Sequence, residues 1–439
     1  MKRACIVALL LASAQAGCQP ASQTSPKPDT HPWLRPWMVG ELQRVRSYAP
    51  TPVAGMQREC LGRLAFEVRS GTEWAADRLE KIEDGEIVEF SDRLPGDRQE
   101  RLAYGDLRIW VSGPATHADM EAAREQRAFS ERGSGAEAWE KGIAEDEAEL
   151  ESVRKNRSEE VVAMFERRLA ESREKLENAR HQKRLDFGMP DELSYDTGRG
   201  QIRIRFLMQG HIFTFVRNHS MLRDGDPRRD AMLAELRDVL SRFRTRAPDE
   251  VPEEPGVCLP YAFIADDGTG DYHTHASFRY PDRPGIVYSI DTGYRPPDGQ
   301  RGAAQLPIPA PVRVLSYPAA ITEVFRGRVR DVYPITPRGA RIGPYSADQG
   351  GLSVNVAKVG EPDIHTYTIF TGLQGIASLQ TWPFIGIEAN SYTRLQYDQL
   401  AENPPPQSET QARLDALLKS MHLRRTTVES PEFAEILDE

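Results

Sequence analysis

Two stretches of the chain begin with the same pattern, a cysteine at the head of an apolar run. Residues 58–68 (RECLGRLAFEV) contain Cys60, and residues 256–265 (GVCLPYAFIA) contain Cys258. Apolar and polar residues alternate after Cys60, which is the period of a half-buried strand. The pattern predicts that each cysteine opens a β-strand at the start of one half of the chain.

Each half ends on a similar helical pattern. The positions Leu236, Val239, Leu240, Phe243 and Arg246 recur at the same offsets as Leu414, Leu417, Leu418, Met421 and Arg424. This spacing places the four apolar residues of each set on one helical face, within helices expected at 227–246 and 409–423. The repeated order predicts two related domains, each a small antiparallel sheet closed by a helix. The alternative is that two unrelated amphipathic helices share a common spacing.

Further elements follow from the same patterns. Residues 202–216 alternate around Gln209-Gly210 and predict a hairpin. Residues 33–55, rich in tryptophan and proline, predict an extended lead-in, and a short helix is expected at 74–82. The second half is mostly strand, with expected runs at 257–264, 285–290, 311–316, 352–359, 365–370 and 376–388.

A long charged segment interrupts the first half. About half of residues 136–186 are charged, both signs are interleaved, and no proline occurs. Pairs such as Glu151 and Lys155 at i,i+4 support an exposed helix. We expect one long helix or a kinked pair, separated by RGSG at 132–135 from a shorter helix at 117–131. A solvated excursion within the first domain is the simpler interpretation, and an arm for a partner is the alternative.

The domain boundary is expected at residues 247–256, where three prolines and four acids occur within ten residues. The predicted class is α+β, with strands paired antiparallel because they follow one another without intervening helices. The expected units are a signal at 1–18, a tether and lead-in at 19–55, an N-terminal domain at 56–246 with a helical insertion at 117–186, and a mostly β C-terminal domain at 257–425.

The N-terminus has the features of an export signal. Lys2 and Arg3 precede an apolar run that is too short to span a bilayer. Residues 14–16 (AQA) fit a cleavage site that would release a soluble periplasmic protein. Alternatively, Ala16-Gly17-Cys18 fits the end of a lipobox, so that Cys18 would carry lipid and a Pro- and Ser-rich tether would follow. The second interpretation places the chain on the outer membrane, since Gln19 rather than Asp follows the cysteine.

Removal of the signal leaves Cys60 and Cys258, which could form a disulfide in an oxidising compartment. Two separately buried thiols are the alternative. Acidic residues (66) exceed basic residues (56), and the pI near 5.6 argues against a nucleic-acid partner. No later run is long and apolar enough to cross a bilayer, so a membrane is expected to be reached only through an N-terminal lipid anchor.

The search for chemistry finds no nucleophile elbow, P-loop, zinc-protease motif or dinucleotide fingerprint. Asp266, Asp267 and Asp271 lie beside His273 and His275, which would share a strand face and could ligate a metal. The Asp-Asp-Gly-Thr-Gly run is more typical of a turn. The sequence therefore predicts neither an enzyme nor a cofactor or metal site.

The chain resembles a known family, the periplasmic immunity proteins that protect bacteria from type VI secretion phospholipase effectors of the fourth class. Residues 59–68 look like its N-terminal Cys-x-Gly-Arg strand, and residues 255–290 look like the start of its C-terminal domain. The resemblance implies an inhibitor that binds a secreted lipase and clamps its cap. Within such a protein we expect the loop carrying Asp266, Asp267 and Asp271 to contact the partner. A lipoprotein scaffold of the envelope is the alternative function.

Overall fold

The structure is a computed structural model that describes residues 36–78, 88–96, 101–220, 222, 224–294, 328–357, 363–376 and 379–429. It confirms the predicted α+β class, because helices and antiparallel strands occur together. The predicted signal, Cys18, the strand expected at 311–316 and the tail after Glu429 lie outside the described residues.

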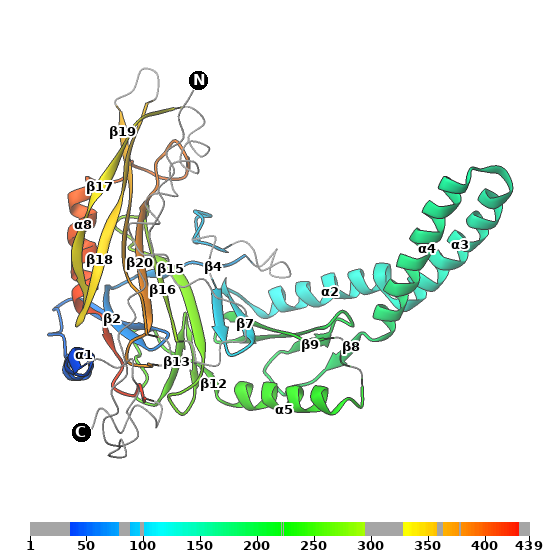
Figure 1. Ribbon diagram of the computed structural model, residues 1–439, viewed down its shortest axis with the longest axis horizontal. Helices are drawn as coiled ribbons and strands as arrows, with labels where there is room; N and C mark the ends of the chain where they lie inside the picture. The colour runs from blue at the N-terminus through cyan, green and yellow to red at the C-terminus, as the bar shows by residue number, and fades with distance from the viewer. Residues whose placement is uncertain are drawn as a thin grey trace, which may run out of the picture.

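One large sheet forms the centre of the molecule and contains fifteen strands within the described residues (Figure 1). The first half contributes β6 (Arg101–Tyr104), β7 (Leu107–Pro114), β8 (Lys183–Leu185), β9 (Leu193–Asp196), β10 (Gln201–Met208) and β11 (His211–Asn218). The second half contributes β15 (Tyr272–Arg279), β16 (Ile286–Tyr294), β17 (Val329–Ile342), β18 (Tyr345–Val356), β19 (Ile364–Leu373) and β20 (Phe384–Ser391). The short strands β3 (Glu73–Trp74), β4 (Ala76–Asp77) and β5 (Val88–Glu89) pair beside this path.

Both halves arrange their strands in the same order. Outward from the centre, the first half runs β6, β7, β11, β10, β9, β8, and the second runs β15, β16, β20, β19, β18, β17. The two sets join where β6 pairs antiparallel with β15. The sequence predicts a separate sheet for each half, whereas the structure has a sheet continuous through both. The hairpin expected at 202–216 is confirmed as β10 and β11.

Two small sheets contain the cysteines, and each takes its third strand from the other half. One contains β1 (Met56–Leu61), β2 (Leu64–Arg69) and β21 (His422–Leu423), the other β13 (Gly256–Leu259), β14 (Ala262–Ala265) and β12 (Phe243–Thr245). The strand that ends the first half thus pairs in the second, and the strand that ends the second half pairs in the first. We call this arrangement the strand exchange.

Each predicted cysteine strand is a hairpin, because the backbone reverses within the apolar run. Gly62 turns the first hairpin with a φ of 60°. A side chain there would meet the Tyr272 ring, since an added Cβ would lie 2.6 Å from it. Tyr261 turns the second with a φ of 61°. Apolar periodicity alone does not reveal such reversals, because the strand residues next to each turn are buried on both sides of it.

The closing helices are α5 (Pro227–Ser241) and α8 (Gln407–Ser420). Asp226 caps α5 by accepting a hydrogen bond from the backbone N–H of Arg228, and Pro227 lies in the first turn, where no N–H is needed. Three of the four apolar residues in each repeated set are buried on these helices. The expectation that Phe243 and Met421 are helical is wrong, because each helix ends before them and the chain continues into a closing strand.

Two further expectations near the N-terminus are wrong. The lead-in contains a helix, α1 (Pro36–Ser47), whose Leu42 and Val45 are buried at helical spacing. The helix expected from residue 74 is replaced by β3 and β4, which pair with the large sheet. Pairing with distant strands overrides the local helical pattern there.

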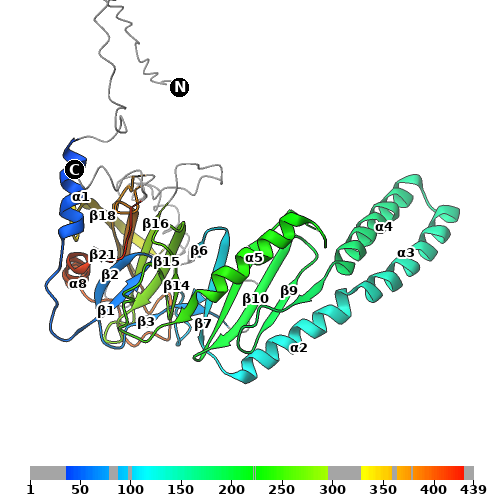
Figure 2. The same cartoon turned by 90° about the horizontal axis from the view of Figure 1, so that it is seen from below.

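The charged segment forms α2 (His117–Ser134), α3 (Ala136–Asn156) and α4 (Glu159–Arg180), which together we call the arm. The arm projects away from the large sheet, and α3 and α4 lie side by side as an antiparallel pair (Figure 2). Gly135 separates α2 from α3, and an added Cβ there would lie 2.5 Å from the backbone oxygen of Glu131. The segment expected as one long helix or a kinked pair is therefore a pair of helices, α3 and α4, that form a helical hairpin.

One hydrophobic core spans both halves. Phe66 and Trp74 of the first half contact Phe278 of the second, with ring centroids 6.3 and 5.4 Å from it. All three side chains are almost completely buried. Separating the halves would expose this aromatic cluster, so the large sheet and its core hold them in one orientation.

Candidate functional site

A disulfide joins the two small sheets. Cys60 of β1 and Cys258 of β13 are bonded to each other across 198 residues of sequence, with Cα atoms 5.7 Å apart. Both cysteines are completely buried. Beside them, Gly62 and Cys258 exchange two backbone hydrogen bonds of 2.8 Å. The cysteines that open the two halves are thus covalently linked.

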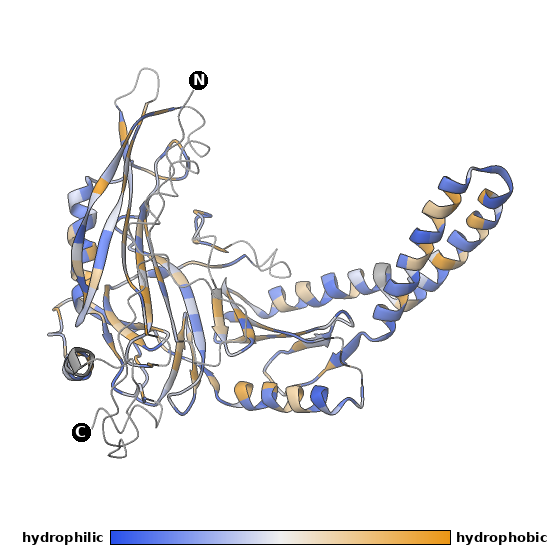
Figure 3. Ribbon diagram, in the orientation of Figure 1, coloured by the Kyte–Doolittle hydropathy of each residue, from blue (hydrophilic) through white to orange (hydrophobic). Residues whose placement is uncertain are grey.

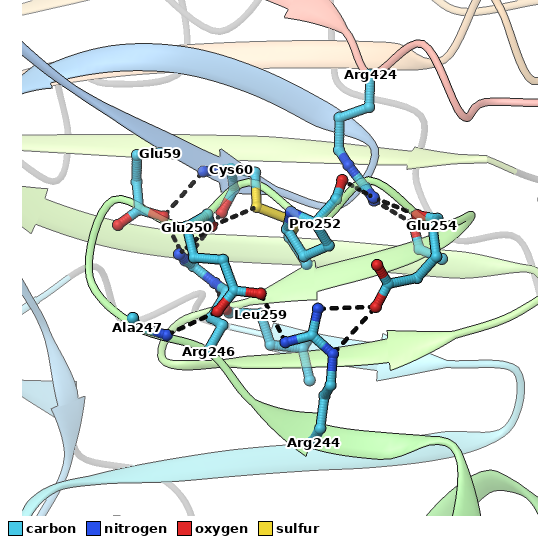
Figure 4. Close-up of a disulfide and its surroundings, with 12 residues drawn as sticks. Glu59, Cys60, Arg244, Arg246, Ala247, Glu250, Pro252, Glu254, Leu259 and Arg424 are labelled. Carbon is cyan, nitrogen blue, oxygen red and sulfur yellow. Dashed lines mark hydrogen bonds and ion pairs between the residues drawn. A yellow bond between two sulfur atoms is a disulfide. The ribbon is translucent and has the colours of Figure 1, made fainter.

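One arginine follows each closing strand directly: Arg246 follows β12, and Arg424 follows β21. The backbone N–H of Arg246 donates to the carbonyl of Tyr261, three residues after Cys258, and that of Arg424 donates to the carbonyl of Arg63, three residues after Cys60. Both side chains extend into the space around the disulfide (Figure 4). The strand exchange therefore has the same register on both sides.

The guanidinium of Arg246 bridges the two halves. It donates to the carbonyl oxygens of Cys60 and Leu259 at 3.3 and 3.2 Å. It also forms an ion pair with Glu59, and both side chains are at most 6% exposed. Because Cys60 and Leu259 belong to different halves, Arg246 connects them through charge-assisted hydrogen bonds.

The guanidinium of Arg424 holds the segment between the halves instead. It donates to the carbonyl oxygens of Pro252, Glu254 and Gly256 at 2.8, 2.6 and 2.7 Å. Burial, together with the nearby charge of Arg63, lowers the pKa of Arg424 to about 10. The segment expected as a domain boundary is therefore bound to the small sheets at several points.

A third arginine holds the same segment from its exposed side. Arg244 donates to the carboxylates of Glu250 and Glu254, both at 2.7 Å. Partial burial opposes ionisation of both carboxyls, but Arg244, together with the N–H of Ala247 at Glu250, outweighs it and keeps each pKa below its ordinary value. These two acids of the expected domain boundary are thus ion-pair partners. Arg244 lies only six and ten residues before them, but the sequence pattern does not show which charged side chains meet.

The acidic loop forms the expected turn. The side chain of Asp266 accepts a hydrogen bond from the N–H of Gly268, and that of Asp267 accepts one from the N–H of Thr269. Arg63 donates to both carboxylate oxygens of Asp266, at 3.2 and 2.8 Å, and both side chains are at most 3% exposed. Asp266 is thus an internal anchor between the halves.

The other two acids of the loop differ in exposure. Asp267 is exposed, and its hydrogen bonds from Thr269 keep the pKa of its carboxyl below the ordinary value. Asp271 is half-buried, and its backbone oxygen accepts a hydrogen bond from Gly105. Of the three acids predicted to contact a partner, only Asp267 has an exposed side chain. That role remains a prediction.

His273 and His275 share a strand face, as their spacing predicts, but their carboxylate partner is Asp291 on β16. Asp291 lies 2.7 Å from Nε2 of His273 and 3.5 Å from Nδ1 of His275. Burial opposes ionisation of Asp291, but the two histidines outweigh it and hold its pKa well below the ordinary value. Asp266 instead binds Arg63, and Asp267 accepts hydrogen bonds from Thr269.

A different group within the described residues brings possible metal ligands together. Atoms of His117, Glu121 and Asp191 lie within 4.8 Å of one another at the start of the arm. Arg124 forms ion pairs with both Glu121 and Asp191, so a cationic side chain already balances the carboxylates. This group therefore serves to attach α2 to the loop before β9.

A pocket of about 220 Å³ lies where α4 returns to the large sheet. Within it, buried Asp196 accepts hydrogen bonds from Arg229 at 3.2 Å and from the N–H of Gly198 at 2.9 Å. Lys183 and Arg229 both pair with Asp224. The acidic and basic side chains of the pocket therefore neutralise each other. This is consistent with a structural contact between the arm and the large sheet.

Residues 250–306 match the family described as Tle cognate immunity protein 4 C-terminal domain. This range covers the segment between the halves, β13 to β16 and the acidic loop. No curated protein matches the sequence. Within the described residues, no helix is long and apolar enough to cross a membrane.

Three solved structures align with most of the chain. The immunity protein TplEi of the type VI secretion system from Pseudomonas aeruginosa, in complex with "L" peptide, is 13% identical, with a TM-score of 0.46 and coverage of 85% of this chain and 99% of that one. The apo form of TplEi is 12% identical, with a TM-score of 0.48 and coverage of 85% and 98%. The Tle4–Tli4 complex contains a chain that is 14% identical, with a TM-score of 0.49 and coverage of 86% and 100%. The match over residues 250–306 confirms the resemblance inferred from the sequence, to an immunity-protein family of inhibitors and not of enzymes.

Proposed function

We propose that this chain is an immunity protein that binds a type VI secretion phospholipase effector and inhibits it. The observation that carries the proposal is the family match over residues 250–306. That segment contains Cys258, the carbonyls held by Arg424 and the loop of Asp266 to Asp271. It is therefore part of the junction between the halves.

The inhibitor acts by clamping the mobile cap of the lipase between its halves. A ligand shifts a conformational equilibrium only by its difference in affinity for the two states, so the clamp must bind the closed cap better than the open one. The disulfide, Arg246 and the shared core support this mechanism, because they fix the halves before binding. A rigid clamp loses less conformational entropy when it binds.

The two halves derive from one repeated unit, and the first half carries the arm as an insertion between β7 and β8. The matching strand order of the halves and the matching register at Arg246 and Arg424 support the repeat. The proposed domain limits are those expected from the sequence, 56–246 and 257–425.

The proposed site of action is the periplasm, with lipidation of Cys18 tethering the chain to the outer membrane. The support is the pattern of the first eighteen residues and the polar segment that follows them. A disulfide between Cys60 and Cys258 fits an oxidising compartment.

The test is the phospholipase activity of the lipase encoded beside this gene, measured with and without the purified residues 31–439. Loss of activity near a one-to-one ratio is the expected result. The same assay is repeated after reduction of the Cys60–Cys258 disulfide, because the clamp mechanism requires the two halves to be held in one orientation. If the lipase stays fully active, or if no lipase gene lies beside this gene, the proposed inhibitor function is refuted and the function of an envelope scaffold is favoured.

A further inference from the structure

The two halves contact each other in a reciprocal pattern. The backbone N–H of Arg246 donates to the carbonyl of Tyr261, and the equivalent N–H of Arg424 donates to the carbonyl of Arg63. The closing strand β12 pairs with β14 of the second half, and the closing strand β21 pairs with β2 of the first. Both contacts from the first half to the second therefore have a counterpart in the opposite direction. Such reciprocity is the rule for the two copies of a dimer with two-fold symmetry.

Equivalent elements of the two halves also meet each other directly. Cys60, which opens the first half, is bonded to Cys258, which opens the second. Strand β6 begins the strand order of the first half and pairs antiparallel with β15, which begins that of the second. An added Cβ at Gly62 would lie 3.0 Å from Oγ1 of Thr274 on β15, so the small sheets lie against this strand pair. In a two-fold dimer, elements at the symmetry axis contact their own counterparts in this way.

The junction between the halves also has a core of its own. Phe66 and Trp74 of the first half pack against Phe278 of the second. The main hydrophobic cluster contains no described residue of α2, α3 or α4, and the ribbon of the arm is largely hydrophilic (Figure 3). Obligate dimers have interfaces that resemble a domain core cut in two. The repeated parts of the halves, and not the arm, form such a core here.

A single segment, residues 246–255, provides the peptide connection between the halves, and it contains no helix or strand. It joins β12 to β13, which pair with opposite edges of β14 and therefore run parallel to each other. Thr245 lies beside Ala262, and Gly256 lies beside Ala265. The segment must cross two strand spacings and return along three residues, a distance of roughly 14 Å. Its length therefore allows one chain to supply both sides of the junction.

We propose that the junction is a strand-exchanged dimer interface contained within one chain, and that a second copy of the chain can supply either half of it. In the domain-swapped dimer, the first half of each copy pairs with the second half of the other, and the contacts of the junction are kept. The native segment favours the single chain, because a partner on a short tether has an effective concentration in the millimolar range. A segment too short to connect β12 to β13 within one copy transfers the same interface to a second copy.

The test shortens this segment in the chain of residues 31–439. Deletion of residues 247–254 leaves Arg246 and Pro255 between the two strands, which together reach at most about 11 Å. The matched control replaces the same residues by an equal number of glycines and serines, so it loses the same side chains but keeps the reach. Both proteins are refolded with oxidised glutathione, which accepts two electrons and two protons from the thiols for each disulfide formed.

The deletion variant is expected to have twice the mass of one chain in light scattering, whereas the control stays a monomer. On a non-reducing gel the dimer should be covalent and separate into single chains on reduction, with Cys60 of one copy bonded to Cys258 of the other. A folded monomeric deletion variant would overturn the proposal. A control that also dimerises would overturn it too, because the lost side chains and not the lost reach would then be the cause.

A second measurement keeps the native segment and does not depend on folding of the shortened chain. The variants Cys60→Ser and Cys258→Ser are mixed, unfolded in urea and refolded together with oxidised glutathione. Neither can form the bond alone, but a swapped pair can join Cys60 of one copy to Cys258 of the other. We expect a covalent mixed dimer whose fraction rises with protein concentration and which peptide mapping assigns to this bond. Variants refolded separately and then mixed should form none, because both positions are buried in the folded chain. Absence of the mixed dimer at every concentration refutes the proposal, whether or not the shortened chain folds.

Discussion

The two small sheets at the disulfide are built alike, yet their closing arginines lie in different electrostatic surroundings. Arg246 has a buried carboxylate partner, Glu59, whereas the guanidinium of Arg424 donates to three backbone carbonyls and lies 5.0 Å from the centre of the Phe263 ring. Burial lowers the pKa of Arg424 to about 10. The comparison shows that one structural position can hold a guanidinium either by neutralising its charge or by surrounding it with carbonyl dipoles.

The largest expected effect comes from removing the bond that joins the two sheets. Cys60→Ser combined with Cys258→Ser should lower the free energy of unfolding by about 4–5 kcal/mol, because the bond closes a loop of 198 residues. Urea unfolding measures this loss. The variant should be insensitive to reductant, whereas the wild type should approach it when reduced. Equal midpoints for oxidised wild type and variant would contradict the prediction.

The arginine comparison can be tested directly. Arg246→Ala strands the buried carboxylate of Glu59 and should cost about 3–5 kcal/mol of unfolding free energy. Arg424→Ala leaves neutral carbonyls without their donor and should cost about 1–3 kcal/mol. Each variant serves as the control for the other in urea unfolding. A larger loss for Arg424→Ala would show that the carbonyl cage holds its charge more strongly than the ion pair does.

Each half also contains a buried acid that makes stability depend on pH. Burial raises the pKa of Asp77 on β4 to about 7, and burial likewise raises the pKa of Glu429, near the end of the second half, to about 7. Between about pH 4 and pH 7 the unfolded chain releases protons that the folded chain keeps, so the free energy of unfolding should fall as pH rises.

Neutral variants remove this dependence. Asp77→Asn and Glu429→Gln should each flatten the fall in stability between about pH 4 and pH 7, measured as the urea midpoint across that range. The double variant should be flatter than either. If the variants keep the slope of the wild type, the two carboxyls are not protonated in the folded state.

The smallest global effect is expected in the arm. Leu150→Ala opens a cavity in the cluster between α3 and α4, which is separate from the main core. The unfolding midpoint of the body should barely change, while amide exchange in α3 and α4 should accelerate. Ile290→Ala in the main core is the matched control and should lower the midpoint clearly. A comparable global loss from Leu150→Ala would show that the arm and body unfold together.

The sequence predicts local elements well where the pattern is long and regular. The hairpin of β10 and β11, the helices α5 and α8 and the helical character of the arm all follow from periodicity. The turns at Gly62 and Tyr261 do not, because the strand residues on both sides of each turn are buried and the apolar pattern shows no break there. Helix α1 was missed because tryptophan and proline obscured the helical spacing of Leu42 and Val45.

The candidate site depends on contacts that no local pattern encodes. The sequence left the pairing of Cys60 with Cys258 open, since spacing does not give the distance between their Cα atoms. It grouped Asp266 with His273, but the partner of Asp266 is Arg63, about two hundred residues away in the chain. Such partners are determined by how the halves meet.

The strand exchange has a consequence for the order in which the chain can mature. A ribosome delivers the N-terminal half first, but its small sheet lacks β21, which lies at His422–Leu423. The first half therefore remains incomplete until almost the last residues have emerged. Loss of the residues from 421 onward would remove β21, the strand that pairs with β2. Chains truncated there should therefore be cleaved by proteases near their N-terminus as well as near their C-terminus.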